Sequence, residues 1–132
     1  MDKMLSALRH GYQRYLLLRR WRDIVEAVSE IICGKLGDAE IYVFGSVVSN
    51  DYTAASDIDV LVVSGKASED KHYVIDLQLY LEDALGLPPG LLHLHVVNPG
   101  SERYYWFMDA LRIRKILIKA CRREEDAAYG EG

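Results

Sequence analysis

The sequence predicts an α+β domain, and two patterns support this fold class. Three short runs rich in β-branched and aromatic residues indicate strands, and segments with apolar residues at helical spacing lie before, between and after them. The chain has 132 residues, a length at which one domain buries roughly two thirds of the surface that its unfolded chain exposes. We therefore expect a single domain over residues 1–132, with residues 124–132 as a loose polar tail.

Apolar residues recur at helical spacing in the first part of the chain, from Leu8 to Leu36. This spacing predicts a long first helix that is broken near its start. Gly37 is the expected stop, because glycine commonly follows the last turn of a helix. Residues 1–20 are then an N-terminal helical extension of the domain.

Three runs predict strands: residues 40–44 (Glu-Ile-Tyr-Val-Phe), 58–63 (Ile-Asp-Val-Leu-Val-Val) and 91–97 (Leu-Leu-His-Leu-His-Val-Val). Residues 47–56 separate the first two and are rich in Ser, Asn, Asp, Thr and Ala. That composition favours a short helical turn and a loop over a further strand.

Two more helices are expected in the second half of the chain. Ser68 is placed to cap a helix whose first turn holds Glu69 and Asp70, since acidic residues are favourable at a helix N-terminus. After the third strand, Ser101 is placed to cap a last helix that continues to about Arg123.

Composition limits the class of protein. Half of the residues are apolar and 27% are charged, a balance typical of soluble globular domains, and we expect a cytoplasmic protein with no membrane span and no signal peptide. The net charge is −4, yet of 16 Lys and Arg residues only Lys35, Lys66 and Lys71 lie between residues 23 and 102. The basic ends would form a positive surface if the terminal helices packed together, or else are ordinary solvated helix faces.

Cys33 and Cys121 are the two cysteines of the chain. Both fall in expected helices, and neither belongs to a CxxC motif. We expect reduced, buried thiols that act as small hydrophobic residues, and neither a disulfide nor a zinc site.

The residues that suggest chemistry lie between the first two strands. Gly45 and Ser46 end the first, and Asp57 and Asp59 begin the second. Side chains alternate along a strand, so both aspartates should point to one side, where a hard divalent cation would offset their repulsion. Gly45 permits close approach of a ligand, and Ser46 offers a hydroxyl and an N–H to phosphate oxygens.

This combination resembles the minimal nucleotidyltransferases of the DNA polymerase beta superfamily. Their signature is a strand, Gly-Ser, a spacer of about ten residues and Asp-x-Asp entering a second strand, matched here by Gly45-Ser46 and Asp57-Ile58-Asp59. The resemblance runs from about Trp21 to Lys119. It implies a small mixed β-sheet flanked by helices, and transfer of AMP from ATP to a hydroxyl with release of pyrophosphate. It also implies that Asp57 and Asp59 hold Mg²⁺ and that Gly45 and Ser46 bind the nucleotide.

The third strand departs from the family pattern, which expects a third carboxylate there. His93 and His95 lie on one face by alternation, and the register aligns His93 with the missing acid. A neutral imidazole accepts a proton or ligates a metal, but it prefers Mn²⁺ or another transition metal to Mg²⁺. His93 is therefore either a catalytic base or metal ligand, or it packs with His95 in a degenerate site.

We expect a chain this short to lack the extra domains with which larger members of the superfamily hold an acceptor. Minimal nucleotidyltransferases are often paired with helical HEPN proteins, so the resemblance implies an antitoxin that transfers AMP, in some such pairs to a tyrosine of the toxin. The alternative is a catalytically degenerate nucleotide- or protein-binding module that blocks its partner by contact. A third interpretation, ranked lower, is an enzyme acting on a small hydroxyl compound.

Four consecutive aromatic residues, Tyr104 to Phe107, cannot all face one core if they lie on a helix. They suggest a contact surface, and we expect a homodimer or a hetero-oligomer. Nucleic acid is not an expected partner, because the chain shows no motif for reading bases.

Overall fold

The computed structural model describes residues 2–122, in which helices and strands alternate. Their order is α1 (Asp2–Arg19), α2 (Trp21–Leu36), β1 (Ala39–Phe44), α3 (Ser46–Ser49), β2 (Ile58–Val63), α4 (Lys71–Ala84), β3 (Leu92–Val97), α5 (Glu102–Leu111) and β4 (Ile116–Cys121). The predicted loose tail, residues 124–132, lies outside the described residues.

The strands form one mixed sheet in the order β3-β2-β1-β4. β1 is antiparallel to both β2 and β4, whereas β2 and β3 are parallel and are connected through α4. The predicted α+β class, with a small mixed sheet flanked by helices, is confirmed.

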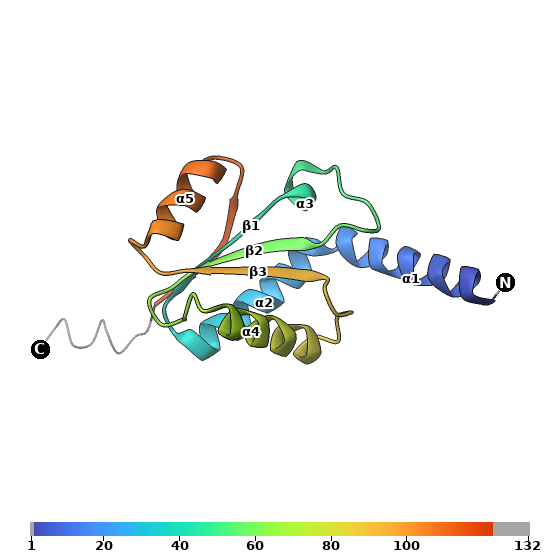
Figure 1. Cartoon of the computed structure of the whole chain (residues 1–132), viewed down its shortest axis with the longest axis horizontal. Coiled ribbons are helices and arrows are strands. Elements are labelled where there is room, and N and C mark those ends of the chain that lie inside the picture. The colour runs from blue at the N-terminus through green and yellow to red at the C-terminus, as the bar shows by residue number, and fades with distance from the viewer. Residues whose placement is uncertain (1, 123–132) are drawn as a thin grey trace, which may run out of the picture.

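The two faces of the sheet are covered unequally. Figure 1 shows α2 and α4 together against one face, and α3 and α5 on the other side. The first face carries the main core, made of alternate strand residues and the inner faces of α2 and α4: Ile41, Val43, Val60, Val62, Leu94, Val96, Val25, Val28, Ile32, Leu77 and Leu81. The second face has only a small cluster under α5, formed by Leu61, Val63, Val97 and Phe107. Polar side chains on that second face can therefore remain accessible.

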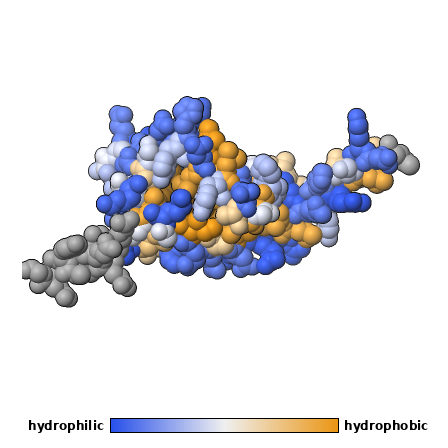
Figure 2. Space-filling model, turned by 90° about the horizontal axis from the view of Figure 1, so that it is seen from below, coloured by the Kyte–Doolittle hydropathy of each residue, from blue (hydrophilic) through white to orange (hydrophobic). Residues whose placement is uncertain are grey.

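The first helical segment is broken at Arg20, as the sequence predicts, into α1 and α2. Gly37 ends α2 in the left-handed conformation, with φ 77°, and its N–H donates to the Cys33 carbonyl. α1 extends away from the sheet (Figure 1). Most of its large apolar side chains are exposed: Met4, Leu5, Leu8, Tyr12, Tyr15 and Leu16. Figure 2 shows hydrophobic colour among hydrophilic residues along this end of the molecule.

The start of α4 differs from the prediction by two residues. α4 begins at Lys71 with Asp70 as its N-cap residue, and Ser68 Oγ instead accepts from the Asp70 N–H at 2.9 Å. The Glu69 carboxylate is used outside the helix, because it accepts from the Asn98 N–H at 2.7 Å and from the Ser101 hydroxyl at 2.6 Å. Ser101 caps α5 as predicted, accepting from the Tyr104 N–H.

The prediction of a last helix reaching Arg123 is wrong. α5 ends at Leu111, Arg112 takes a positive φ of 46°, and the chain returns as β4. β4 pairs with β1, with Ala39 opposite Cys121. Pairing satisfies the backbone groups of β1, which would otherwise be a sheet edge. That gain depends on a strand about 80 residues away, which helical spacing does not reveal.

The prediction of two reduced thiols is also wrong, and of the two cysteines only Cys33 lies in a helix, as expected. Cys33 and Cys121 form a disulfide with a Cα–Cα distance of 6.0 Å. Cys121 lies on β4, and β4 packs beside α2, which carries Cys33. Once the last segment is a strand, the two side chains face one another.

The terminal basic segments do not combine into one surface. Figure 1 shows α1 and α5 at opposite ends of the sheet. Lys119 lies on β4 and forms an ion pair with Glu30 of α2 at 2.5 Å. None of the helices within residues 2–122 has the length and apolar character needed to cross a membrane.

Candidate active site

The site lies on the second face of the sheet, where three strands meet. Asp59 on β2 is directly opposite His93 on the parallel strand β3, and Leu61 is opposite His95. Asp59 also pairs with Phe44, the last residue of β1, which is followed by Gly45 and Ser46. Strand alternation sends Ile58 into the main core and leaves Asp59, His93 and His95 on the more open face.

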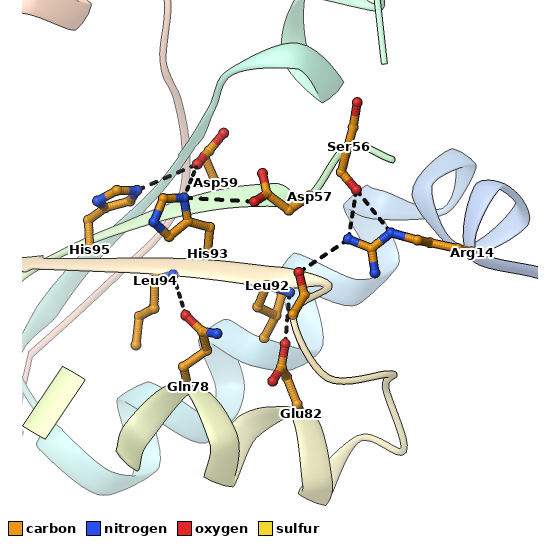
Figure 3. A network of polar contacts seen from close by, with 11 residues as sticks. Arg14, Ser56, Asp57, Asp59, Gln78, Glu82, Leu92, His93, Leu94 and His95 are labelled. Atoms are coloured by element: carbon orange, nitrogen blue, oxygen red, sulfur yellow. Dashed lines mark hydrogen bonds and ion pairs between the residues drawn. The ribbon is translucent and has the colours of Figure 1, made fainter. Parts of the chain in front are cut away.

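Asp59, His93 and His95 form a compact group (Figure 3). Asp59 Oδ1 is 3.1 Å from His93 Nδ1 and 3.5 Å from His95 Nε2. Potential ligand atoms of the three residues all lie within 4.8 Å of one another. The side chains of Asp59 and His95 are 19% and 18% exposed, so most of their surface is shielded from water.

Asp57 lies at the outer edge of this group, just before β2. Its Oδ2 is 3.8 Å from His93 Nδ1, and its side chain is 41% exposed. Figure 3 shows the carboxylates of Asp57 and Asp59 on the same side as the His93 ring. The structure thus brings together both predicted aspartates and the predicted histidine.

Gly45 makes room for Asp59. Its backbone has φ 84° and ψ −155°, a region open almost only to glycine, and a Cβ built on it would collide with Asp59 Oδ2. The space left by the missing side chain of Gly45 is therefore occupied by the Asp59 carboxylate. Ser46 follows Gly45 as the first residue of α3.

Aromatic rings hold His95 in place. Its ring centroid lies 5.3 Å from that of Phe44 and 5.3 Å from that of Phe107, and 4.2 Å from that of His93. Phe107, on α5, is 6% exposed. The sequence pointed to His93 ahead of His95, yet both rings face Asp59, as alternation along β3 allows.

Arg14 of α1 holds the loops that enter the site. Its Nε and Nη2 donate to the Ser56 carbonyl at 3.2 and 2.8 Å, and Nη2 also donates to the Gly90 carbonyl at 3.2 Å (Figure 3). Ser56 immediately precedes Asp57, and Gly90 lies just before β3. The sequence carries no signal for this role, because Arg14 is one of several arginines on an exposed helix.

Two side chains of α4 complete the edge strand β3. Gln78 Oε1 accepts from the Leu94 N–H and Glu82 Oε2 accepts from the Leu92 N–H, both at 3.0 Å (Figure 3). Such contacts replace the missing strand partner of an edge. They hold the backbone on both sides of His93, a role that sequence reasoning missed because it depends on the packing of α4.

A comparison with protein-family models agrees with this geometry. The model described as "Nucleotidyltransferase domain" matches residues 25–122, which include Gly45, Ser46, Asp57, Asp59 and His93. The chain belongs to the nucleotidyltransferase family. No curated protein sequence matches this nucleotidyltransferase.

Solved structures resemble the fold of this nucleotidyltransferase at low identity. A candidate nucleotidyltransferase from Sulfolobus solfataricus is 21% identical, with a TM-score of 0.47, covering 82% of this chain and 85% of that one. A toxin-antitoxin structure with AMP-PNP is 16% identical, with a TM-score of 0.52, covering 80% and 81%. A mutant of the toxin-antitoxin MntA-HpeT is also 16% identical, with a TM-score of 0.47, covering 79% and 80%.

Proposed function

We propose that this nucleotidyltransferase transfers AMP from ATP to a hydroxyl group in a metal-dependent reaction. The observation that carries the proposal is the meeting of Asp57, Asp59 and the Gly45-Ser46 turn within a nucleotidyltransferase domain. Carboxylate oxygens are the ligands that Mg²⁺ and Mn²⁺ accept, so Asp57 and Asp59 fit such an ion. A bound divalent cation supplies positive charge against the triphosphate.

Each residue of the site has a distinct task in the proposed reaction. Ser46 binds phosphate oxygens through its hydroxyl and N–H, and Gly45 leaves space for Asp59. The acceptor oxygen bonds to the α-phosphorus while the bond from that phosphorus to the bridging oxygen breaks, and pyrophosphate leaves. His93 Nδ1, which faces both carboxylates, takes the proton of the acceptor hydroxyl.

The proposed acceptor is a tyrosine of a HEPN toxin, which makes this chain an antitoxin. The fold neighbour with a TM-score of 0.52 is a toxin-antitoxin structure with AMP-PNP, an ATP analogue, and this supports both the nucleotide and the class of partner. The exposed apolar residues of α1, among them Leu5, Leu8 and Tyr12, offer a surface that a helical protein would cover.

A second candidate function is a nucleotide- or protein-binding module without turnover. It is favoured by one observation: His93 stands 3.1 Å from Asp59 and 3.8 Å from Asp57, so an imidazolium there would offset the charges that otherwise call for a metal. Such a module would neutralise its partner by contact alone.

Calorimetry of ATP binding, first with Mg²⁺ and then with Mn²⁺, tests the proposal. Wild type is compared with Asp57→Asn/Asp59→Asn and with a matched control, Asp76→Asn/Asp83→Asn, whose carboxylates are exposed on α4. We expect metal-dependent binding that is lost only in the first variant, and transfer of label from α-labelled ATP to the partner. Binding without any transfer would favour the second function, and no binding with either metal would refute the first.

A further inference from the structure

We infer that Asp59, His93 and His95 form a binding site for a borderline transition-metal ion, of the class of Zn²⁺ or Co²⁺, that prefers such ions to Mg²⁺. Any role of this ion in catalysis rests on the proposed function, but its binding does not; while the ion is bound, His93 Nδ1 is a ligand and is not free to take the acceptor proton. The site differs from the carboxylate pair of Asp57 and Asp59, because two of its three donors are imidazole nitrogens.

Distances between the donor atoms suit such an ion. Metal–nitrogen and metal–oxygen bonds of roughly 2.0–2.2 Å in a tetrahedral site place neighbouring donors about 3.4 Å apart. Asp59 Oδ1 lies 3.1 Å from His93 Nδ1 and 3.5 Å from His95 Nε2. The donor nitrogens of the two imidazoles are within 4.8 Å of one another. The His93 side chain is exposed, so its ring can rotate to bring the two nitrogens to the separation that a shared ion requires.

The donors are held by rigid elements. Asp59 and His93 are opposite each other on paired parallel strands, and His95 follows two residues later on the same face. The His95 ring packs against Phe44 and Phe107, and α4 fixes the β3 backbone through Gln78 and Glu82. Asp59 and His95 therefore lose little side-chain freedom when an ion binds, which favours affinity.

The type of donor decides which ion is preferred. Mg²⁺ requires oxygen ligands and near-octahedral geometry, whereas imidazole suits Zn²⁺, Co²⁺ and related ions. Three protein ligands beside an open position are also the usual arrangement of catalytic zinc centres. The His93 side chain is 54% exposed, so the fourth coordination position of a bound ion would face solvent, on the side of Asp57.

Cobalt titration of the untagged full chain tests the inference. The protein is freed of metal by chelation and kept without thiol reductant, so that Cys33 and Cys121 stay bonded, and neither ATP nor partner is added. Co²⁺ in a tetrahedral site with imidazole ligands gives intense visible absorption bands, whereas the octahedral hydrated ion absorbs only weakly. We expect saturable bands at one equivalent, displaced by Zn²⁺ but not by a hundredfold excess of Mg²⁺, and a rise in melting temperature with Zn²⁺.

Three variants localise the site. His93→Ala and His95→Phe should each weaken Co²⁺ binding at least tenfold, the latter while keeping an aromatic ring packed against Phe44 and Phe107. His72→Ala removes an exposed histidine of α4 and should bind as wild type does. Equal binding by wild type and both site variants, or no bands in the wild type at all, would overturn the inference.

The outcome is separable from that of the proposed function. ATP binding with Mg²⁺ alongside absent cobalt bands would leave the proposed function standing and reject this metal site. Cobalt bands without ATP binding would establish the metal site and reject the proposed function. His93→Asp, which supplies a carboxylate at the same position, should weaken Co²⁺ binding relative to Mg²⁺ and shift ATP binding toward Mg²⁺.

Discussion

The contact between Gly45 and Asp59 shows how one residue controls the site. A side chain at position 45 would both force a Cβ into a glycine-only region of φ and ψ and push against Asp59 Oδ2. We expect Gly45→Ala to lower the free energy of unfolding by about 1–3 kcal/mol, the usual cost of such backbone strain.

The same substitution should weaken metal-dependent ATP binding, because Asp59 must move. Urea unfolding and calorimetry would measure the two effects. Gly65→Ala is the control, since a Cβ at Gly65 meets open space. Equal losses in both variants would contradict the explanation based on Asp59.

Ionisation of the Glu69 carboxylate makes the free energy of unfolding depend on pH. The hydrogen bond from the Ser101 hydroxyl, and then that from the Asn98 N–H, hold the pKa of Glu69 below its ordinary value. A carboxylate with a lowered native pKa stabilises the fold above its unfolded pKa, and this contribution is lost as pH falls through the native value.

We therefore expect Glu69→Gln to destabilise the protein at pH 7 and to have a smaller effect at acidic pH, below the lowered pKa. Thermal unfolding between pH 7 and pH 3 would measure this difference. Glu102→Gln, an exposed change at the start of α5, is the control. A loss of stability in Glu69→Gln that is the same at every pH would contradict the assignment.

At the scale of elements, α1 is connected to the site by the hydrogen bonds of Arg14. Arg14 links α1 to the carbonyls of Ser56, the residue before Asp57, and of Gly90, which lies two residues before β3. A guanidinium bonded to carbonyl oxygens contributes roughly 1.5–3 kcal/mol when buried, and less here because the group is only partly buried.

Arg14→Ala should therefore weaken ATP binding severalfold and speed amide hydrogen exchange in residues 51–57, with little change in the main core. Arg9→Ala removes an exposed arginine from the same helix and is the matched control. If exchange in residues 51–57 were unchanged in Arg14→Ala, the positioning role would be refuted.

β3 and β4 show what local patterns capture and what they miss. The β3 prediction succeeded because alternation and β-branched residues are local properties. The helical prediction for residues 116–121 fails because the partner that favours a strand there, β1, is distant in sequence. The register that aligns His93 with Asp59 was likewise set by pairing with β2.

At the scale of the whole molecule, the disulfide joins α2, which precedes the first strand, to β4, the last strand. Cys33 and Cys121 are separated by 88 residues, and a cross-link closing so long a loop restricts the unfolded chain strongly. For loops of this length the chain-entropy model predicts a contribution of about 3–5 kcal/mol.

Cys33→Ala/Cys121→Ala should lower the free energy of unfolding by this amount, measured by urea titration without reductant. Wild type treated with dithiothreitol should unfold at nearly the same urea concentration as the variant. Insensitivity of the wild type to dithiothreitol, together with two titratable thiols in the native protein, would show that the cross-link is absent.

Local sequence patterns were sufficient to predict the family and to bring the candidate site residues together. Gly45, Ser46, Asp57 and Asp59 lie within 15 residues of chain, so strand alternation and spacing were sufficient to place them together. Helix stops such as Gly37 and caps such as Ser101 are equally local.

Only the tertiary structure decided the features that join distant segments: β4, the disulfide, the support by Arg14, and the grouping of both histidines with Asp59. Each forms because packing and strand pairing lower the free energy of the folded chain by more than local preferences oppose it. A pattern among neighbouring residues therefore cannot predict contacts between segments that are far apart in the sequence.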